Sequence, residues 1–477
     1  MIKKFLEYSI GNIFVLIVSL ITTPIITNIL SPNEYGKVSL FITFCNVASL
    51  IVLAGMDQVY MRFYYEKSEN KYNLLKHILN YIFKSFCIFL IIIFLFRNQI
   101  SKFILGYESI SVLLMITFNI ITLVFMRIGF CSIRMQQKGK LYSYSQIVGK
   151  VIYILAIFIF YFIYKDDYKT LVFTMISTNI CITLFLMYVD RYNIKKSILY
   201  KCDYDYKFKD KIKFGLPFVF SAAFIWIFKS SDTIIIKAYN GHEEVGIYSI
   251  AFSLIGVVNI IQSTFMNFWT PIANEAFEKN PENTDFFVRI NDMVIYLMFI
   301  VCSSIVILKD CIHLILGQEY YQAVYLLPFL IFIPLMSVIS ETTVQGINFK
   351  KSSKYHTYIS IICALINIIL NIVLVKIFSL QGAAIATAIS YFIYFYLRTK
   401  ISINLYPVKF RLNKFYISTI IFLIFTIYNS YRPIDFGGIG LYILFISLIT
   451  KFYNREFEYI LRKIRNFRKD DTRFISR

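Results

Sequence analysis

Long apolar stretches alternate with short polar segments along the whole chain. Each stretch is close to the length of about 20 residues that an α-helix needs to cross a bilayer. The pattern predicts an all-α polytopic membrane protein. Its fourteen expected transmembrane helices lie near residues 9–30, 38–57, 77–96, 110–128, 145–164, 169–189, 214–237, 246–270, 291–308, 324–345, 357–378, 382–397, 413–430 and 437–450. The first stretch is followed directly by another, which indicates a first span and not a cleaved signal peptide.

The segments between the predicted spans are alternately rich and poor in Lys and Arg. With the N-terminus inside, the cytoplasmic segments hold 37 of the 49 Lys and Arg residues and the outer segments hold nine. Because cytoplasmic loops retain positive charge during insertion, we expect both termini and the loop 190–213 to be cytoplasmic. The net charge of +21 is thus gathered where anionic lipid attracts it, so membrane lipids are expected partners and nucleic acid is not.

The composition of the chain excludes several classes of chemistry. With 58% hydrophobic and 16% charged residues, there is no room for a large soluble domain. Eight cysteines include no C-x-x-C pair and four histidines form no H-x-x-x-H motif, so we expect no metal and no cofactor. Asp203-Tyr204-Asp205 has the D-x-D spacing of sugar transferases, which raises a membrane glycosyltransferase or polysaccharide polymerase as an alternative. The motif lies in a short Lys-rich loop and no large outer loop exists, so we expect no enzyme.

The chain contains an internal duplication. Three short matches occur in order at offsets of 210 and 211 residues. The matched segments are Glu34-Tyr35-Gly36-Lys37-Val38-Ser39-Leu40 with Glu244-Val245-Gly246-Ile247-Tyr248-Ser249-Ile250, Ile104-Leu105-Gly106-Tyr107-Glu108 with Ile315-Leu316-Gly317-Gln318-Glu319, and Lys140 and Tyr144 with Lys351 and Tyr355. Each repeat holds six spans, an even number, so both enter the membrane in the same direction.

This duplication predicts the domain organisation. We expect an N-terminal six-helix lobe at 1–212 and a C-terminal six-helix lobe at 213–408, arranged as parallel bundles around a central cavity. Two additional helices at 409–453 lie outside the duplication and are expected to pack outside the bundles, where they could offer a lipid tail a groove. Residues 454–477 form a basic cytoplasmic tail.

The chain resembles the multidrug, oligosaccharidyl-lipid and polysaccharide exporter superfamily, and most closely its oligosaccharide flippases (polysaccharide biosynthesis proteins). The segments that carry the resemblance are Gly11-Asn12 through Leu30-Ser31-Pro32-Asn33-Glu34-Tyr35-Gly36, Gly55-Met56-Asp57 leading to Arg62-Phe63-Tyr64, Gly215-Leu216-Pro217 through Asp232 to Val245-Gly246-Ile247-Tyr248-Ser249, and Gly382-Ala383-Ala384-Ile385-Ala386-Thr387. The resemblance implies two six-helix lobes and transport of an undecaprenyl-diphosphate-linked sugar repeat unit to the outer leaflet. Fourteen spans fit this branch and the lipid II flippases, whereas the drug exporters usually have twelve.

A few cations lie within or beside the predicted spans near their cytoplasmic ends. They are Arg62, Lys84, Arg127 and Lys150. A lipid diphosphate has to be captured from the cytoplasmic leaflet, and Arg and Lys both suit phosphate oxygens, so these four are candidate substrate-binding residues. The alternative is that their long side chains only extend to the cytoplasmic interface.

Three further ionisable residues lie deeper, where charges are costly and often functional. Lys229 and Asp232 share one helical face in span 7. Lys229 is a candidate substrate contact and Asp232 its counter-ion, with a self-neutralised structural pair as the alternative. We also expect Arg62, Lys84 and Lys229 to line the cavity. Glu341, beside Thr342 and Thr343, could bind a coupling Na⁺ or H⁺, or join two helices as a buried carboxyl.

The sequence thus predicts a flippase that moves a lipid-linked oligosaccharide from the cytoplasmic to the outer leaflet by alternating access. Its expected partner is a polyprenyl diphosphate, and a polysaccharide polymerase is a further partner that fits this role. A cation-coupled small-molecule exporter or a lipid II flippase of the same fold remains the alternative. The sugar, the coupling ion and the oligomeric state are left open by the sequence.

Overall fold

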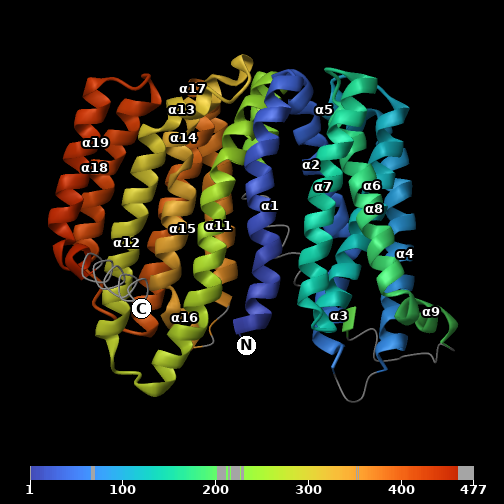
Figure 1. Cartoon of the computed structure of the whole chain (residues 1–477), viewed down its shortest axis with the longest axis horizontal. Helices are drawn as coiled ribbons and strands as arrows, with labels where there is room; N and C mark the ends of the chain where they lie inside the picture. Colours follow the sequence, from blue (N-terminus) through green and yellow to red (C-terminus); the bar gives the residue numbers. More distant parts are fainter. Residues whose placement is uncertain are drawn as a thin grey trace, which may run out of the picture. The chain divides into compact units, whose positions relative to one another are not determined.

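The structure is a computed structural model of the chain, shown in Figure 1. It describes residues 2–65, 70–200, 211–212, 215, 226, 230–350, 352 and 354–459, which form helices and turns and no strand. The chain divides into two compact units, unit 1 (Met1–Ser249) and unit 2 (Ile250–Arg477). The lobe boundaries expected from the sequence lie elsewhere and stay predictions.

Unit 1 is an assembly of long apolar helices with three short ones. Helices suit these apolar runs because a bilayer offers the backbone no other hydrogen-bond partners. Helix α8 packs on α6 and α7, α1 packs on α7, and α4 packs on α2, α3 and α9. The elements are α1 (Ile2–Ile29), α2 (Pro32–Leu53), α3 (Met56–Phe63), α4 (Lys71–Leu95), α5 (Arg97–Leu105), α6 (Ile110–Met135), α7 (Gly139–Tyr164), α8 (Lys169–Val189), α9 (Arg191–Leu199) and the start of α11 (His242–Lys279).

Unit 2 continues α11 and is built around the long helix α17, which packs on α14, α15 and α16. A residue with non-helical dihedral angles, Ser379, lies inside α17, so this one element contains two of the predicted spans. The elements are α12 (Thr284–Ile307), α13 (Lys309–His313), η1 (Gln318–Tyr320), α14 (Gln322–Leu330), α15 (Phe332–Thr343), α16 (Gln345–Phe349), α17 (Lys354–Leu405), α18 (Leu412–Ser430) and α19 (Phe436–Phe452).

Within the described part of the chain, nine helices are long and apolar enough to cross a membrane. Two shorter apolar helical segments, Ile17–Ile29 and Phe436–Phe452, add to them. The all-α membrane fold is therefore confirmed. The count of fourteen spans stays a prediction, since most of the predicted span 214–237 lies outside the described residues.

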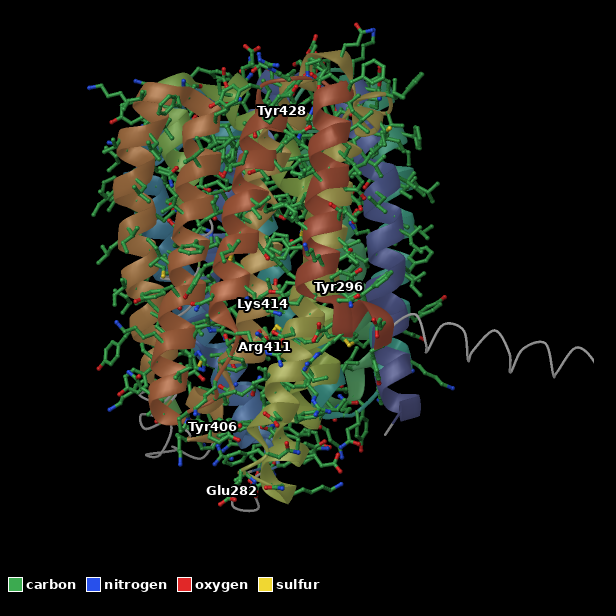
Figure 2. The ribbon with its side chains drawn as sticks, turned by 90° about the vertical axis from the view of Figure 1, so that its left-hand side faces the viewer. Glu282, Tyr296, Tyr406, Arg411, Lys414 and Tyr428 are labelled. Carbon is green, nitrogen blue, oxygen red and sulfur yellow. The ribbon has the colours of Figure 1, made fainter. Side chains whose placement is uncertain are left out.

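The last helix pair is attached to unit 2 at both of its ends. Helix α18 packs on α12 and α14, and α19 packs on α12. Arg411, just before α18, forms an ion pair with the buried Asp292 of α12 at 3.0 Å. At the other end, the Lys309 ammonium donates to the carbonyl of Arg432 at 3.0 Å. Figure 2 labels Arg411 and Tyr428 near these two opposite ends of α18. The pair is thus a fixed part of unit 2.

A side-chain contact within unit 1 joins the first and second repeats at equivalent positions. The hydroxyls of Ser39 in α2 and Ser249 in α11 lie 2.6 Å apart, and these residues are 210 positions apart in sequence. The same offset relates the two segments matched by sequence. A residue meets its own counterpart only close to a twofold axis, so the contact indicates a local pseudo-twofold axis between α2 and α11.

Two glycines make this crossing of α2 and α11 possible. A Cβ atom on Gly36 would lie 1.8 Å from the carbonyl oxygen of His242, and one on Gly246 would lie 1.9 Å from that of Pro32. These two contacts are reciprocal, because His242 follows Pro32 by the same 210 residues that separate Gly246 from Gly36. Only glycine permits such a close approach of two backbones. The matched E-x-G segments therefore mark the point at which the repeats touch.

The backbone repeats itself at a second place. Lys165, which ends α7, has φ 53° and ψ −133°. Ser379 inside α17 has φ 51° and ψ −133°. Non-glycine residues rarely adopt positive φ values. The two residues lie between predicted spans 5 and 6 and between predicted spans 11 and 12, so this shared turn supports the duplication.

His242 adds a titratable group at the crossing. Its Nδ1 lies 2.9 Å from the Lys237 ammonium and its Nε2 lies 2.9 Å from the carbonyl oxygen of Ile104. The ammonium donates to Nδ1, so Nε2 carries the proton and donates to Ile104. Burial and the nearby cations Lys237 and Lys37 lower the pKa of His242 from 6.5 to about 4.

Acid should therefore weaken this part of unit 1. Because the folded pKa of His242 is lowered, its contribution to stability is complete above about pH 6.5 and is lost as the pH falls toward 4. We expect His242→Gln to reduce the loss of thermal stability between pH 6.5 and pH 4, measured on the purified protein in detergent. An unchanged pH profile in this variant would contradict the assignment.

Candidate functional site

Asp57, a buried carboxylate in unit 1, is the partner of the predicted cation Arg127. The guanidinium of Arg127 in α6 binds Asp57 in α3 through Nη2 at 2.9 Å and Nε at 3.0 Å. Asp57 is buried, whereas 42% of the Arg127 side chain is exposed. Arg127 was predicted as a substrate contact from its position alone. Its guanidinium is accessible, but a phosphate would have to share it with Asp57 or replace Asp57.

The backbone around Gly55 explains how Asp57 reaches α6. Helix α2 ends at Ala54 and Gly55, which have φ values of 46° and 76°. A Cβ atom on Gly55 would lie 2.2 Å from the carbonyl oxygen of Gly215. The predicted single span 38–57 is therefore broken, and α3 starts in a new direction with Asp57 in its first turn. The local structure thus explains the residues of the segment Gly55-Met56-Asp57, which is one of those that carry the family resemblance.

Lys84 belongs to a polar row along α4. Asn73, His77, Asn80 and Lys84 follow one another at spacings of four, three and four residues, so they share one helical face. Asn80 and Lys84 are exposed, and the opposite face carries buried residues such as Ile78. Lys84 lies seven residues into the predicted span 77–96, about 10 Å from its start at 1.5 Å per residue.

The other two predicted cations lie on two further helices. Arg62 is exposed on α3, on the side opposite the buried residues of that helix. Lys150 in α7 is half-buried, and its ammonium lies 5.2 Å from the ring centroid of Tyr153. The four cations thus come from α3, α4, α6 and α7. Whether they act together on one substrate stays a prediction.

Of the predicted pair Lys229 and Asp232, the structure describes Asp232 only, because Lys229 lies outside the described residues. Asp232 is buried, and its Oδ2 accepts a hydrogen bond of 2.5 Å from the hydroxyl of Tyr248 in α11. Tyr248 belongs to the segment that repeats Glu34–Leu40. The sequence singled out this tyrosine as part of a motif but did not indicate its role.

In unit 2, Glu341 has a partner that the sequence did not suggest. Its Oε1 lies 2.8 Å from Nη1 of Arg398, and both side chains are buried. The same Nη1 donates to the Ser340 hydroxyl at 2.6 Å, and the Arg398 guanidinium lies 4.9 Å from the Tyr394 ring centroid. The predicted span 382–397 ends just before Arg398, but α17 continues to Leu405 and places Arg398 inside the helix.

The backbone carbonyl of Glu341 is also hydrogen-bonded. The carbonyl of Glu341 accepts hydrogen bonds from the Trp269 indole at 3.1 Å and from Gln345 at 2.8 Å. A coupling Na⁺ at Glu341 would have to replace the guanidinium of Arg398, which already neutralises the carboxylate. Within the described residues, no group of His, Cys, Asp and Glu side chains could hold a metal ion.

Comparison with solved structures identifies the fold. The structure described as "Lipid II flippase MurJ, inward closed conformation" matches with a TM-score of 0.70 at 15% identity, over 96% of this chain and 99% of that one. An inward-facing multidrug resistance MATE family transporter of the MOP superfamily matches with a TM-score of 0.60 at 12% identity, over 85% of this chain and 99% of the transporter. At these identities the likeness concerns the fold.

Comparison of the sequence with protein families shows to which family the chain belongs. No curated protein matches the chain. The family described as polysaccharide biosynthesis protein, in contrast, matches residues 1–277, which is more than half of the chain. This agrees with the resemblance seen in the sequence, and the protein therefore belongs to the polysaccharide biosynthesis protein family.

Proposed function

We propose that this protein is a flippase that moves an undecaprenyl-diphosphate-linked oligosaccharide from the cytoplasmic to the outer leaflet of a bacterial cytoplasmic membrane. The observation that carries the proposal is the polar row on α4 that ends at Lys84. A charged residue in a helix that faces lipid costs about 2.5 to 3.5 kcal/mol at the bilayer centre. Asn80 and Lys84, which are exposed within the predicted span 77–96, are therefore suited to a water-filled passage.

The cations of unit 1 supply what a lipid diphosphate needs. Lys84 and Arg62 are exposed on α4 and α3, and the Arg127 side chain is 42% exposed while Asp57 holds its guanidinium in place. A diphosphate that binds Arg127 would form charge-assisted hydrogen bonds to the planar guanidinium. Asp57 and a phosphate would compete for Arg127, so the ion pair offers a means to release the substrate again.

The contact of α2 with α11 supports alternating access as the mechanism. In such a mechanism, we expect the repeats to separate where Ser39 meets Ser249 and where Gly36 meets Gly246 when the passage opens to the outer side. Transport by this mechanism makes and breaks no covalent bond. Family membership and the likeness to the lipid II flippase and to transporters both agree with this role.

Mass spectrometry of lipids that copurify with the protein tests the proposal. We expect a polyprenyl diphosphate that carries a sugar repeat unit, bound in excess over its share of the membrane. A lipid II molecule in its place would favour the lipid II flippase of the same fold. Turnover of a nucleotide sugar by the purified protein would contradict the proposal and favour a membrane glycosyltransferase.

Neutralising Lys84 should impair transport more than folding. We expect Lys84→Gln to reduce transport of the lipid-linked oligosaccharide in proteoliposomes on the order of tenfold, since hydrogen bonds to charged groups contribute about 1.5 to 3 kcal/mol. Thermal stability should change little, because Lys84 is exposed. Lys140→Gln, at an exposed cation in the first turn of α7, is the control and should transport normally. Equal transport by both variants would remove Lys84 from the passage.

A further inference from the structure

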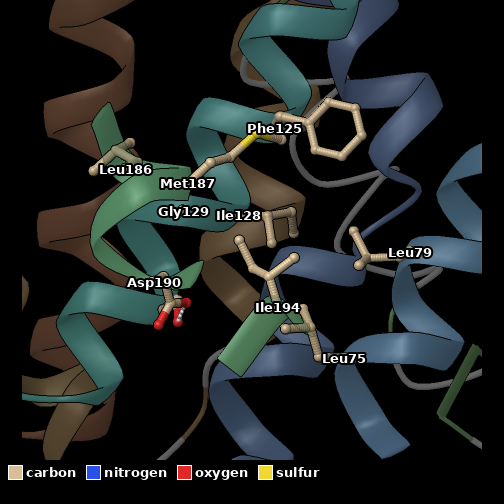
Figure 3. A pocket seen from close by; sticks show the side chains of 10 residues that line it. Leu75, Leu79, Phe125, Ile128, Gly129, Leu186, Met187, Asp190 and Ile194 are labelled. Atoms are coloured by element: carbon tan, nitrogen blue, oxygen red, sulfur yellow. Dashed lines mark hydrogen bonds between the residues drawn. The ribbon is translucent and has the colours of Figure 1, made fainter. Parts of the chain in front are cut away.

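A narrow cavity of about 50 Å³ lies among α4, α6, α8 and α9 of unit 1. Figure 3 shows Leu79 of α4 and Asp190 at the α8–α9 junction on opposite sides of it, with Ile194 of α9 between them. The lining is apolar apart from two side chains. Its residues are Leu75, Leu79, Phe125, Ile128, Gly129, Ser132, Leu186, Met187, Asp190 and Ile194.

Asp190, the one carboxylate of this lining, already accepts three hydrogen bonds. Asp190 accepts hydrogen bonds from the Ser132 hydroxyl at 2.5 Å, from Gln136 at 2.8 Å and from Asn193 at 2.5 Å. Such hydrogen bonds satisfy a buried carboxylate and leave it little capacity for a further partner. The cavity therefore suits an apolar ligand.

A second cavity continues the first along α4. It has a volume of about 60 Å³ and shares Leu79 and Phe125 with the first as lining residues. Together they follow α4 from Leu75 to Phe86, about 16 Å at 1.5 Å per residue, or half of a hydrocarbon core of about 30 Å. A third cavity, at Phe89 and beyond, shares no lining residue with these two. The depth thus corresponds to one leaflet.

Helix α9, which borders the first of the two cavities, is basic and aromatic. Helix α9, which contributes Ile194 to the lining, carries exposed Arg191, Lys195 and Lys196. On the same exposed side, Tyr192 and Leu199 are 63% and 70% exposed. Basic residues interspersed with aromatic and aliphatic ones are typical of a helix that lies in the headgroup region of a membrane. Positive charge at this depth attracts anionic headgroups.

The position of α9 is fixed by α4. The Lys76 ammonium of α4 donates to the carbonyls of Ile198 and Tyr200 at the end of α9, at 3.2 Å and 2.5 Å. Lys196 lies over the rings of Tyr192 and Tyr72, at 4.4 Å and 5.4 Å from their centroids. Helix α9, with its basic residues, is therefore held against α4 beside the first cavity.

We propose that the paired cavity under α9 binds one acyl chain of an anionic phospholipid, whose phosphate is held by Lys195 and Lys196. The occupant comes from the leaflet on the side of α9, which is the cytoplasmic leaflet in the predicted orientation. This lipid is distinct from the transported substrate. The proposal needs neither the substrate nor the transport mechanism to be as proposed above.

Native mass spectrometry of the full chain, titrated with phosphatidylglycerol or phosphatidylcholine, tests this site. We expect tighter binding of phosphatidylglycerol. The double variant Lys195→Gln, Lys196→Gln should weaken it on the order of tenfold or more, since each Lys or Arg near a membrane surface contributes about fivefold. The matched control is Lys138→Gln, Lys140→Gln, which removes two exposed cations from the turn between α6 and α7 and should bind like the wild type.

A second variant tests the acyl chain independently of charge. Leu79 lines both cavities, so Leu79→Trp should fill their junction and abolish selective binding of phosphatidylglycerol. Ile128→Phe, in the first cavity only, is the milder variant if Leu79→Trp does not fold. Leu95→Trp on the exposed side of α4 is the control.

Three outcomes would overturn the proposal. One is equal binding of phosphatidylglycerol and phosphatidylcholine by the wild type. Another is unchanged phosphatidylglycerol binding in both the charge variant and the cavity variant. The third is displacement of phosphatidylglycerol by a polyprenyl phosphate at equal concentration, which would show that the cavity holds the tail of the transported lipid.

Discussion

Oxidation of a variant that carries Ser39→Cys and Ser249→Cys is expected to abolish transport, and reduction to restore it. The two hydroxyls lie 2.6 Å apart, so the sulfur atoms that replace them would lie within reach of a disulfide. A covalent bond here would hold α2 and α11 together at the point where the two repeats touch. If the passage opens by separation of the repeats, the cross-linked protein would be confined to the closed state.

The cross-link needs a background without the native cysteines, because Cys45 lies in the same helix as Ser39. Each single cysteine variant is the control and should transport equally with and without oxidant. Transport in proteoliposomes is compared with the cross-linked fraction, followed by gel electrophoresis after a specific protease cut between the repeats. Normal transport by fully cross-linked protein would show that α2 and α11 do not separate during the cycle.

The duplication could be predicted from the sequence because it is a pattern within the chain. Short matches at one offset were enough to align Gly36 with Gly246 and Ser39 with Ser249. The sequence does not show that these matched segments touch each other, because two equivalent segments can lie together or apart in the folded protein. The close approach of the backbone at Gly36 to His242 supplies the physical reason for glycine there.

Apolar patterning also predicted the all-α membrane fold, but not the places where helices break or continue. The span predicted at 38–57 is interrupted at Ala54, whose positive φ of 46° has no sequence signature in a non-glycine residue. Conversely, α17 continues through Arg398. A charged residue normally ends an apolar run, and the ion pair with Glu341 on α15 makes Arg398 acceptable inside the helix.

The partners of the charged residues could not be predicted because they are tertiary. Arg127 and Asp57 are 70 residues apart, and Arg398 and Glu341 are 57 residues apart. The sequence identified Arg127 and Glu341 by the cost of a charge in the membrane, which requires a partner but does not name it. Asp57 could have been found as the only carboxylate in predicted span 2.

Removing Glu341 is expected to destabilise the protein more than removing Arg398. Breaking a buried ion pair by removal of one partner costs about 3 to 5 kcal/mol because the other charge is left uncompensated. In Glu341→Gln the remaining guanidinium stays charged, since Arg is not deprotonated in proteins. In Arg398→Met the remaining carboxyl can take up a proton and become neutral. Thermal unfolding in detergent should therefore give the lower midpoint for Glu341→Gln.

The double variant Glu341→Gln, Arg398→Met completes the test. It leaves no buried charge, so we expect it to be more stable than Glu341→Gln alone, and this coupling identifies the pair as a structural link between α15 and α17. Ser340→Ala removes only the neutral partner of the Arg398 Nη1 and should have a smaller effect. A Glu341→Gln protein with wild-type stability that has lost a dependence of transport on Na⁺ or H⁺ would contradict this structural role. That result would instead make Glu341 the coupling site considered from the sequence, with Arg398 as the group that the cation displaces.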